Sequence, residues 1–137
     1  MRTLMFILPA LMSGPALAAD HYELDREHTT ILFFINHLGF SEMVGAFTAF
    51  DGNFMFDPAH AEESRLDVTL KPSGVRTSSE TLDRVLQGER FFHTDQFPVI
   101  RFTSTAVAAT GADTGTITGN LTMLGVTKPI TDRKSVV

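Results

Sequence analysis

The histidines are the side chains in this sequence best suited to metal binding or acid–base chemistry. They form neither an HxH nor an HExxH pattern, nor the spacing of a site with two histidines and one carboxylate. We therefore predict no metal site. The serines and carboxylates likewise show no GxSxG motif and no defensible carboxylate pair, which argues against an enzyme of the hydrolase class. The five histidines are His21, His28, His37, His60 and His93.

Some of these polar side chains still allow a role in ligand recognition. His37 falls on the expected inward face of a strand, where it is either a satisfied histidine at a rim or a contact for a ligand head group. An enzyme that uses His37 or His93 remains the less favoured alternative. Cations near the predicted helix could meet a pyrophosphate or quinone head group, although pairing with nearby carboxylates in solvent is the simpler interpretation. These cations are Arg76, Arg84, Arg90 and Arg101.

Phenylalanine supplies nearly all of the aromatic content, with 12 Phe, one Tyr and no Trp. Most aromatic rings of the chain therefore lack a hydrogen-bonding group. The segment 90–102 concentrates four of them around Pro98, which fixes its own φ and biases Phe97 toward an extended conformation. No acid, base or nucleophile pair accompanies them. This segment predicts the wall of an apolar chamber that holds a molecule without transforming it.

The composition fits one small domain of 137 residues and excludes several function classes. Without residues 1–19, ten basic residues stand against 16 acidic ones, so the net charge is −6 and a nucleic-acid partner is not expected. The absence of cysteine excludes disulfides, thiolate catalysis and zinc–thiolate sites.

The two ends of the chain differ from the rest. Residues 1–19 combine Arg2, an apolar stretch too short to span a bilayer, and small residues before Asp20, a pattern that predicts a cleaved signal peptide and a periplasmic protein. An N-terminal membrane anchor is the alternative. Residues 132–137 interrupt an alternating pattern and can be back-translated into a sequencing-adapter sequence. We expect a non-native tail there, with a genuine charged terminus as the alternative.

Residues 20–131 contain short alternating segments separated by turn signals, which predict one antiparallel β domain. Between Phe47 and Phe50 the parity of the apolar positions changes, so we expect a bulge or bend there. One helix is predicted over 78–87, capped by Ser78 or Ser79 and ended by Gly88. Strands are predicted over 28–37, 43–47, 50–56, 65–71, 102–108, 116–124 and 126–131.

The inward positions of these elements are mostly apolar and are the candidates for binding a ligand. Each could equally fill a solid core, because the interior of a small barrel holds either packed side chains or one small ligand. Gly45, Gly52 and Gly119 on inward faces favour space being left. The candidate ligand-binding residues are Phe33, Ile35, His37, Met43, Phe47, Phe54, Leu66, Leu82, Phe91, Phe92, Phe97, Phe102 and Met123.

Three ordered blocks of the chain resemble the YceI-like family of exported polyisoprenoid-binding proteins. They are Thr29 to Gly52, Phe91 to Phe102, and Gly119 to Pro129. The resemblance implies a lipocalin-like antiparallel β-barrel with one short helix, incomplete at its C-terminus here. It implies binding, sequestration or transport of a polyisoprenoid lipid or isoprenoid quinone in the cell envelope, with no cofactor and no catalysis.

Leu32 and Phe34 depart from the polar pattern expected on the outer face of this family's first strand. These two side chains could form an apolar patch on the outer face of the strand. The patch could contact a partner, a further segment of the domain, a membrane surface or a second copy of the chain in a homodimer. The alternative function is a non-catalytic envelope interaction protein with a solid core. It would act through exposed strand edges or through this outer patch.

Overall fold

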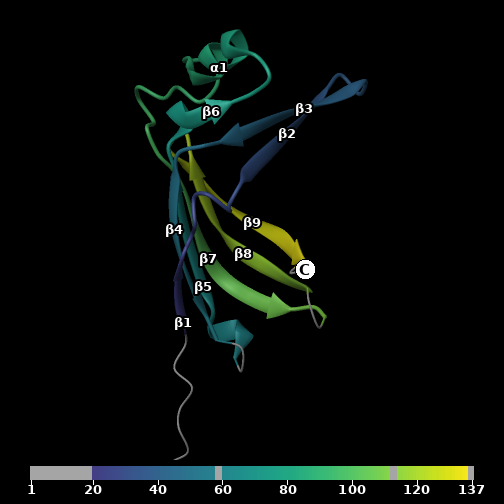
Figure 1. Ribbon diagram of the computed structural model, residues 1–137, viewed down its shortest axis with the longest axis vertical. Helices are drawn as coiled ribbons and strands as arrows, with labels where there is room; N and C mark the ends of the chain where they lie inside the picture. The colour runs from purple at the N-terminus through teal and green to yellow at the C-terminus, as the bar shows by residue number, and fades with distance from the viewer. Residues whose placement is uncertain (1–19, 58–59, 112–113, 136–137) are drawn as a thin grey trace, which may run out of the picture.

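Two antiparallel sheets and one α-helix make up the chain in a computed structural model that describes residues 20–57, 60–111 and 114–135 (Figure 1). The larger sheet has six strands in the order β1-β4-β5-β7-β8-β9, and the smaller has three in the order β2-β3-β6. This arrangement confirms the predicted all-β class with one short helix. The predicted signal peptide and the last two residues of the chain lie outside the described residues.

The six-stranded sheet is strongly curved, and β7, β8 and β9 sweep away from β1, β4 and β5 (Figure 1). Every neighbouring pair in it is antiparallel. Within the described residues β1 and β9 form its two edges, and no ladder joins them into a closed barrel. The strands are β1 (Asp20–Glu23), β4 (Phe50–Phe56), β5 (Arg65–Leu70), β7 (Ile100–Ala109), β8 (Thr114–Met123) and β9 (Val126–Ser135).

The smaller sheet is mainly a hairpin that extends away from the six-stranded sheet (Figure 1). It consists of β2 (Ile31–His37), β3 (Ser41–Phe47) and the two-residue β6 (Val75–Arg76). The hairpin turns at Leu38 and Gly39, whose φ angles of 58° and 78° are both positive. The Gly39 amide donates to Asn36 Oδ1 at 2.7 Å, so an asparagine side chain secures the turn.

The predicted bend between Phe47 and Phe50 is confirmed, and it carries the chain from one sheet into the other. Thr48 leaves the smaller sheet and donates from its amide and its hydroxyl to the Gly74 carbonyl, at 3.0 and 2.9 Å. The Ala49 carbonyl accepts from the Lys71 amide at 2.8 Å. The apolar residues before the bend belong to the smaller sheet and those after it belong to the six-stranded sheet. Their parity changes because both sheets direct apolar side chains toward the same core.

Helix α1 (Glu80–Gln87) confirms the predicted helix and its ends. Ser79 is the N-cap, and its hydroxyl accepts from the Leu82 amide. Asp83, which is buried, accepts from the Thr77 amide and hydroxyl, each at 2.7 Å. These bonds fix the loop that precedes the helix. Two 3₁₀ turns, η1 (Ala61–Glu63) and η2 (Pro72–Gly74), complete the regular elements.

Strand β9 corrects one expectation. It does not stop at Thr131 but continues through Asp132 to Ser135, paired with β8. A strand ladder needs only backbone amides and carbonyls, so the loss of an apolar pattern does not end it, and charged residues are common on edge strands.

The core lies where the two sheets and α1 meet. Its buried residues are Phe47, Val75, Leu86 and Ile100, and partly buried residues that include Phe33, Phe92 and Leu121 pack against them. The rings of Phe33, Phe47 and Phe92 contact one another, with centroids 5.2 to 6.1 Å apart. We call this group the core cluster.

Candidate functional site

One face of the six-stranded sheet is apolar along most of its length. We define it as the inner face, the side that carries Leu70, Ile100 and Leu121, which belong to or pack against the core cluster. Directly paired residues of neighbouring antiparallel strands point to the same side. The strand register therefore places a row across the inner face: Gly52, Val68, Phe102, Leu121 and Lys128.

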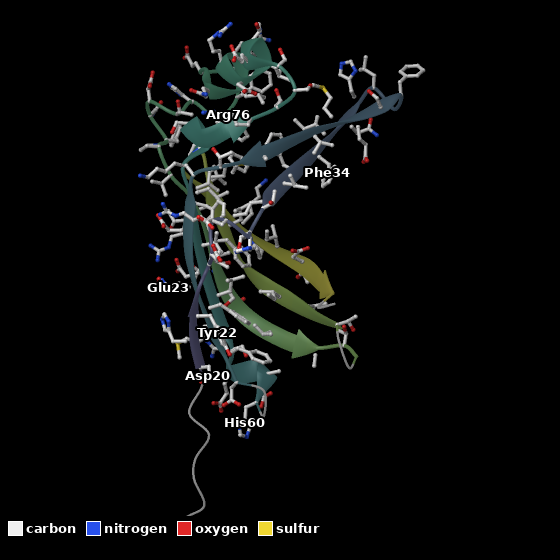
Figure 2. All side chains as sticks on the ribbon, in the orientation of Figure 1. Asp20, Tyr22, Glu23, Phe34, His60 and Arg76 are labelled. Carbon is white, nitrogen blue, oxygen red and sulfur yellow. The ribbon has the colours of Figure 1, made fainter. Side chains whose placement is uncertain are left out.

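Beyond this row the inner face continues as an aromatic strip away from the core cluster. The rings of Tyr22 and Phe54 have centroids 6.4 Å apart, and those of Phe54 and Phe56 are 5.7 Å apart and stacked. Figure 2 shows Tyr22 on the inner side of β1, with Glu23 pointing away from it. From Phe50 to Phe56 the face extends about 20 Å, at roughly 3.3 Å per residue of strand.

The structure divides the candidate ligand-binding residues among three places. The first group belongs to the core cluster or packs against it: Phe33, Phe47, Leu82 and Phe92. The second lies on the inner face or at its upper end: Phe54, Leu66, Phe102 and Met123. Phe97 lies close to this end, beside the Gly125 backbone. The third group stands apart from both: Ile35, His37 and Met43 on the β2–β3 hairpin, and the exposed Phe91. The candidates therefore do not line one common chamber.

The expectation that inward glycines leave free space is wrong. A Cβ at Gly119 would lie 2.5 Å from Phe102 Cζ, and one at Gly52 would lie 2.6 Å from Leu24 Cδ1. The ring of Phe33 likewise occupies the place of a Cβ at Gly45. Each glycine makes room for a neighbouring side chain, a common use of glycine in strands where another group approaches closely.

Three of the four arginines named for head-group contact, Arg76, Arg84 and Arg101, bond to other groups of the chain. Arg101 lies on the opposite, outer face, where its Nη2 donates to Asp67 Oδ2 at 2.9 Å and helps hold the pKa of Asp67 below its usual value. Arg84 Nη2 donates to Thr81 Oγ1 at 3.2 Å, and Arg76 Nη1 donates to its neighbour's carbonyl oxygen at 2.6 Å. Strand pairing thus directs Arg101 to a carboxylate on the outer face, whereas Arg84 and Arg76 bond within their own segments.

Several inner-face residues are not among the candidates selected from the sequence. Tyr22 was not considered, and Phe56, Ile117 and Ile130 were not included among the ligand-binding candidates, although strand alternation alone would select them. Lys128 was also missed, because a lysine inside an alternating edge strand does not stand out without knowledge of the strand's inward parity. It lies opposite Leu121 on the inner face.

One group within the described residues has the composition of a cation site. The ligand atoms of Asp57, His60 and Glu63 all lie within 4.8 Å of one another. Asp57 is buried and its Oδ1 accepts from the His60 amide at 3.1 Å, while His60 and Glu63 are exposed. This bond is typical of an aspartate that caps the turn leading into η1.

Within the described residues, no helix has both the length and the apolar character that a membrane-spanning helix requires.

Comparison with known proteins gives the chain a family. A model of the YceI-like domain matches residues 22–135. A UPF0312 protein from Ectopseudomonas mendocina (strain ymp) is 42% identical over 123 residues, which cover 88% of this chain and 64% of that protein. The chain belongs to the YceI-like family. A UPF0312 protein from Azotobacter vinelandii is 43% identical over 122 residues, which cover 88% of this chain and 63% of that protein.

Solved structures agree with the YceI-like fold. The YceI protein of Campylobacter jejuni is 38% identical, with a TM-score of 0.65 over 82% of this chain and 66% of that chain. BcnA of Burkholderia cenocepacia has a TM-score of 0.76 at 23% identity, over 82% of this chain and 70% of its own, a likeness of fold alone. This YceI-like chain therefore spans less than two thirds of the length of the first two relatives.

Proposed function

We propose that this protein binds a long apolar amphiphile, such as a polyisoprenoid lipid or an isoprenoid quinone, along the inner face of the six-stranded sheet. The observation that carries the proposal is the apolar strip that runs from the core cluster through Phe54 and Phe56. Binding is the whole activity: the protein sequesters or transports the molecule without changing it. Family membership supports the fold on which such a surface is built.

The physical case rests on the partial burial of this strip. Phe54, Leu66, Phe102 and Ile117 are half-buried, so each retains apolar surface that an extended chain can cover. Removing apolar groups from water contributes about 0.8 kcal/mol for each CH₂ group buried. A lipid tail lying along about 20 Å of strand can therefore bind tightly with few polar contacts.

A pair of adjacent substitutions tests the proposed surface. Phe54 faces inward and Asn53 faces outward on the same strand. Phe54→Asp places a charge on the apolar strip, and we expect it to weaken binding of farnesol at least about tenfold in a fluorescence or calorimetric titration. Asn53→Asp adds the same charge on the outer face and should leave farnesol binding unchanged. Equal binding by both variants would contradict the proposed surface.

Stability and native ligands provide two further checks. Phe54→Leu keeps an apolar side chain and should retain most of the affinity even if it unfolds more easily, which separates loss of binding from loss of folding.

Native mass spectrometry of the protein purified from cells should show a co-purified lipid. A chain that is consistently empty in such spectra would count against lipid binding.

We place this activity in the bacterial cell envelope, in the periplasm. The support is the sequence of residues 1–19, with its positive start, short apolar stretch and small residues before Asp20. Fractionation of cells that express the whole reading frame tests the location. Retention of residues 1–19 on a cytoplasmic protein would contradict it.

The exposed β2–β3 hairpin favours a second candidate function. Phe34 is 60% exposed and Leu32 is 49% exposed on the side of β2 that points away from the core cluster. An interaction protein with a filled core would use this patch to bind a partner, a second copy or transiently a membrane surface. If Phe34→Ser abolishes an envelope phenotype while farnesol binding persists, this candidate is favoured over lipid binding.

A further inference from the structure

Lys128 is the one lysine or arginine that the strand register places in the inner-face row of Val68, Phe102 and Leu121. It is paired with Leu121, and Leu121 is paired with Phe102. On its own strand, Val126 and Ile130 stand two residues to either side and point to the same face. Its neighbours on this face are thus apolar on both strands.

No described residue forms a hydrogen bond or an ion pair with the Lys128 side chain. Two exposed arginines do have carboxylate partners. Arg101 pairs with Asp67 and Arg26 pairs with Asp51, and both aspartates lie on the outer face. Asp132 shares the inner face of β9 with Lys128 but stands four residues away, about 13 Å along a strand, and it has an interaction of its own. Lys128 therefore presents an ammonium group with three free donors.

The ammonium group of Lys128 stands at one end of the apolar strip. Lys128 lies close to the core-cluster end of the inner face, in the same row as Phe102 and Leu121, on the edge strand β9. From there the inner face continues through Ile130 and Gly119 toward Phe54 and Phe56. A molecule bound along this strip would have its tail on the aromatic rings and one end beside Lys128.

We infer that Lys128 binds the anionic head group of the amphiphile, and that the protein selects a prenyl phosphate over a neutral isoprenoid such as a quinone or an alcohol. The inference rests on the proposed lipid-binding function and specifies its ligand class. Charge complementarity is the argument, because a phosphate monoester offers three acceptor oxygens to an ammonium that lacks a partner. A neutral head group would leave the ammonium's charge unmatched beside an apolar surface.

The experiment compares two probes that share one tail, farnesyl phosphate and farnesol. The wild-type protein should bind farnesyl phosphate about tenfold or more tightly than farnesol, the range expected for a charge-assisted contact. Lys128→Met should remove this preference by weakening farnesyl phosphate binding about tenfold, with farnesol binding unchanged or slightly tighter. Lys128→Arg should restore the preference, because the positive charge is kept.

Lys71→Met is the matched control. Lys71 is also an exposed lysine, but it lies in the loop after β5, outside the strands that form the inner face. Its loss changes the net charge by the same amount as the loss of Lys128. The preference for farnesyl phosphate should therefore survive in Lys71→Met if a local contact, and not overall charge, creates it.

The outcomes separate this inference from the proposed function. If neither probe binds the wild-type protein, lipid binding itself is wrong. If both probes bind and Lys128→Met leaves their ratio unchanged, the lipid site stands and the head-group contact is wrong. If inorganic phosphate alone binds at Lys128 as tightly as farnesyl phosphate does, Lys128 is a plain anion site unrelated to the apolar strip, and the inference also fails.

Discussion

At the scale of single residues, contacts between glycines and rings determine how the inner face is filled. Gly119 and Phe102 are typical, because the ring of Phe102 covers the position that a Cβ at residue 119 would take. The strand backbone is close by as well, with Thr103 O 2.5 Å from that position. A ring can shift, whereas a backbone oxygen within a ladder has little freedom to move.

Gly119→Ala should therefore destabilise the protein by about 1 to 3 kcal/mol, the usual range for overpacking. Urea denaturation followed by far-UV circular dichroism measures the change. Asn120→Ala is the control, because Asn120 is exposed on the outer face, and its effect should stay within about 0.5 kcal/mol. An unchanged midpoint for Gly119→Ala would show that the space over Gly119 is free after all.

The outer face contains an ion pair whose effect should depend on pH. The pKa of Asp67 is lowered, first by hydrogen bonding to Arg101 and also by the Thr103 hydroxyl, which donates at 2.9 Å. A carboxylate whose pKa is lower in the folded state stabilises the fold above its unfolded pKa of about 3.9. That stabilisation disappears as the pH falls through the folded pKa.

Asp67→Asn should lower the unfolding free energy at pH 7 by less than about 1 kcal/mol, because both partners are partly exposed. The difference from wild type should shrink between pH 7 and pH 2, because protonation of the wild-type carboxyl removes this stabilisation. Urea titrations at both pH values measure it. Glu89→Gln, at an exposed residue near the end of the helix, is the control, and an equal pH dependence in that variant would assign the effect to net charge.

At the scale of elements, local sequence signals decided where α1 begins and ends. Ser79 has an extended backbone and its hydroxyl accepts from the Leu82 amide at 3.4 Å, while Gly88 is the C-cap. The sequence left Ser78 and Ser79 as alternatives for the N-cap. The structure selects Ser79, because only this residue directly precedes the first helical turn.

Ser79→Ala should cost about 0.5 to 2 kcal/mol of stability by leaving a helix amide without its side-chain partner. Ser78→Ala removes the same hydroxyl group one residue earlier, where it is exposed and does not cap the helix. Thermal denaturation of the two variants side by side provides the comparison. If Ser78→Ala is the more destabilising of the two, the assignment of the cap is wrong.

At the scale of the whole molecule, some apolar side chains are buried in the core cluster and others are exposed on the β2–β3 hairpin. The core cluster joins both sheets to α1, whereas the β2–β3 hairpin reaches away from it (Figure 1). Phe34 is labelled on this arm in Figure 2, well separated from the six-stranded sheet. At the hairpin turn, Phe40 is 91% exposed. Exposed apolar groups beside an open strand edge favour association between molecules.

Phe34→Ser combined with Phe40→Ser should reduce self-association in sedimentation-velocity experiments without lowering the unfolding free energy by more than about 0.5 kcal/mol. These side chains make few contacts that unfolding would lose. Phe47→Ala is the opposite case, since Phe47 is buried in the core cluster and its loss should cost about 3 to 5 kcal/mol. A large loss of stability in the double variant would instead indicate that the hairpin packs against the body in solution.

The local features of this protein could be predicted from residues that are close together along the chain. Strand alternation, the helix with its caps, the bend after Phe47 and three ordered family blocks all depend on residues that are near neighbours along the chain, where side-chain period and turn chemistry act. The same reasoning failed at β9, where the apolar pattern stops at Asp132 but the backbone ladder continues.

Pairing between distant strands determines which inward residues share a surface, and this pairing could not be predicted from the sequence. The sequence grouped Phe33, Phe54 and His37 together by parity, yet they lie in the core cluster, on the inner face and on the exposed hairpin. For Arg101 it favoured a nearby carboxylate over a ligand head group, and strand pairing supplies that carboxylate as the distant Asp67 on the outer face. Strand pairing also brings Lys128 beside Leu121 on the inner face. The reason is physical: parity fixes the side of a strand, but only pairing between distant strands determines what stands beside it.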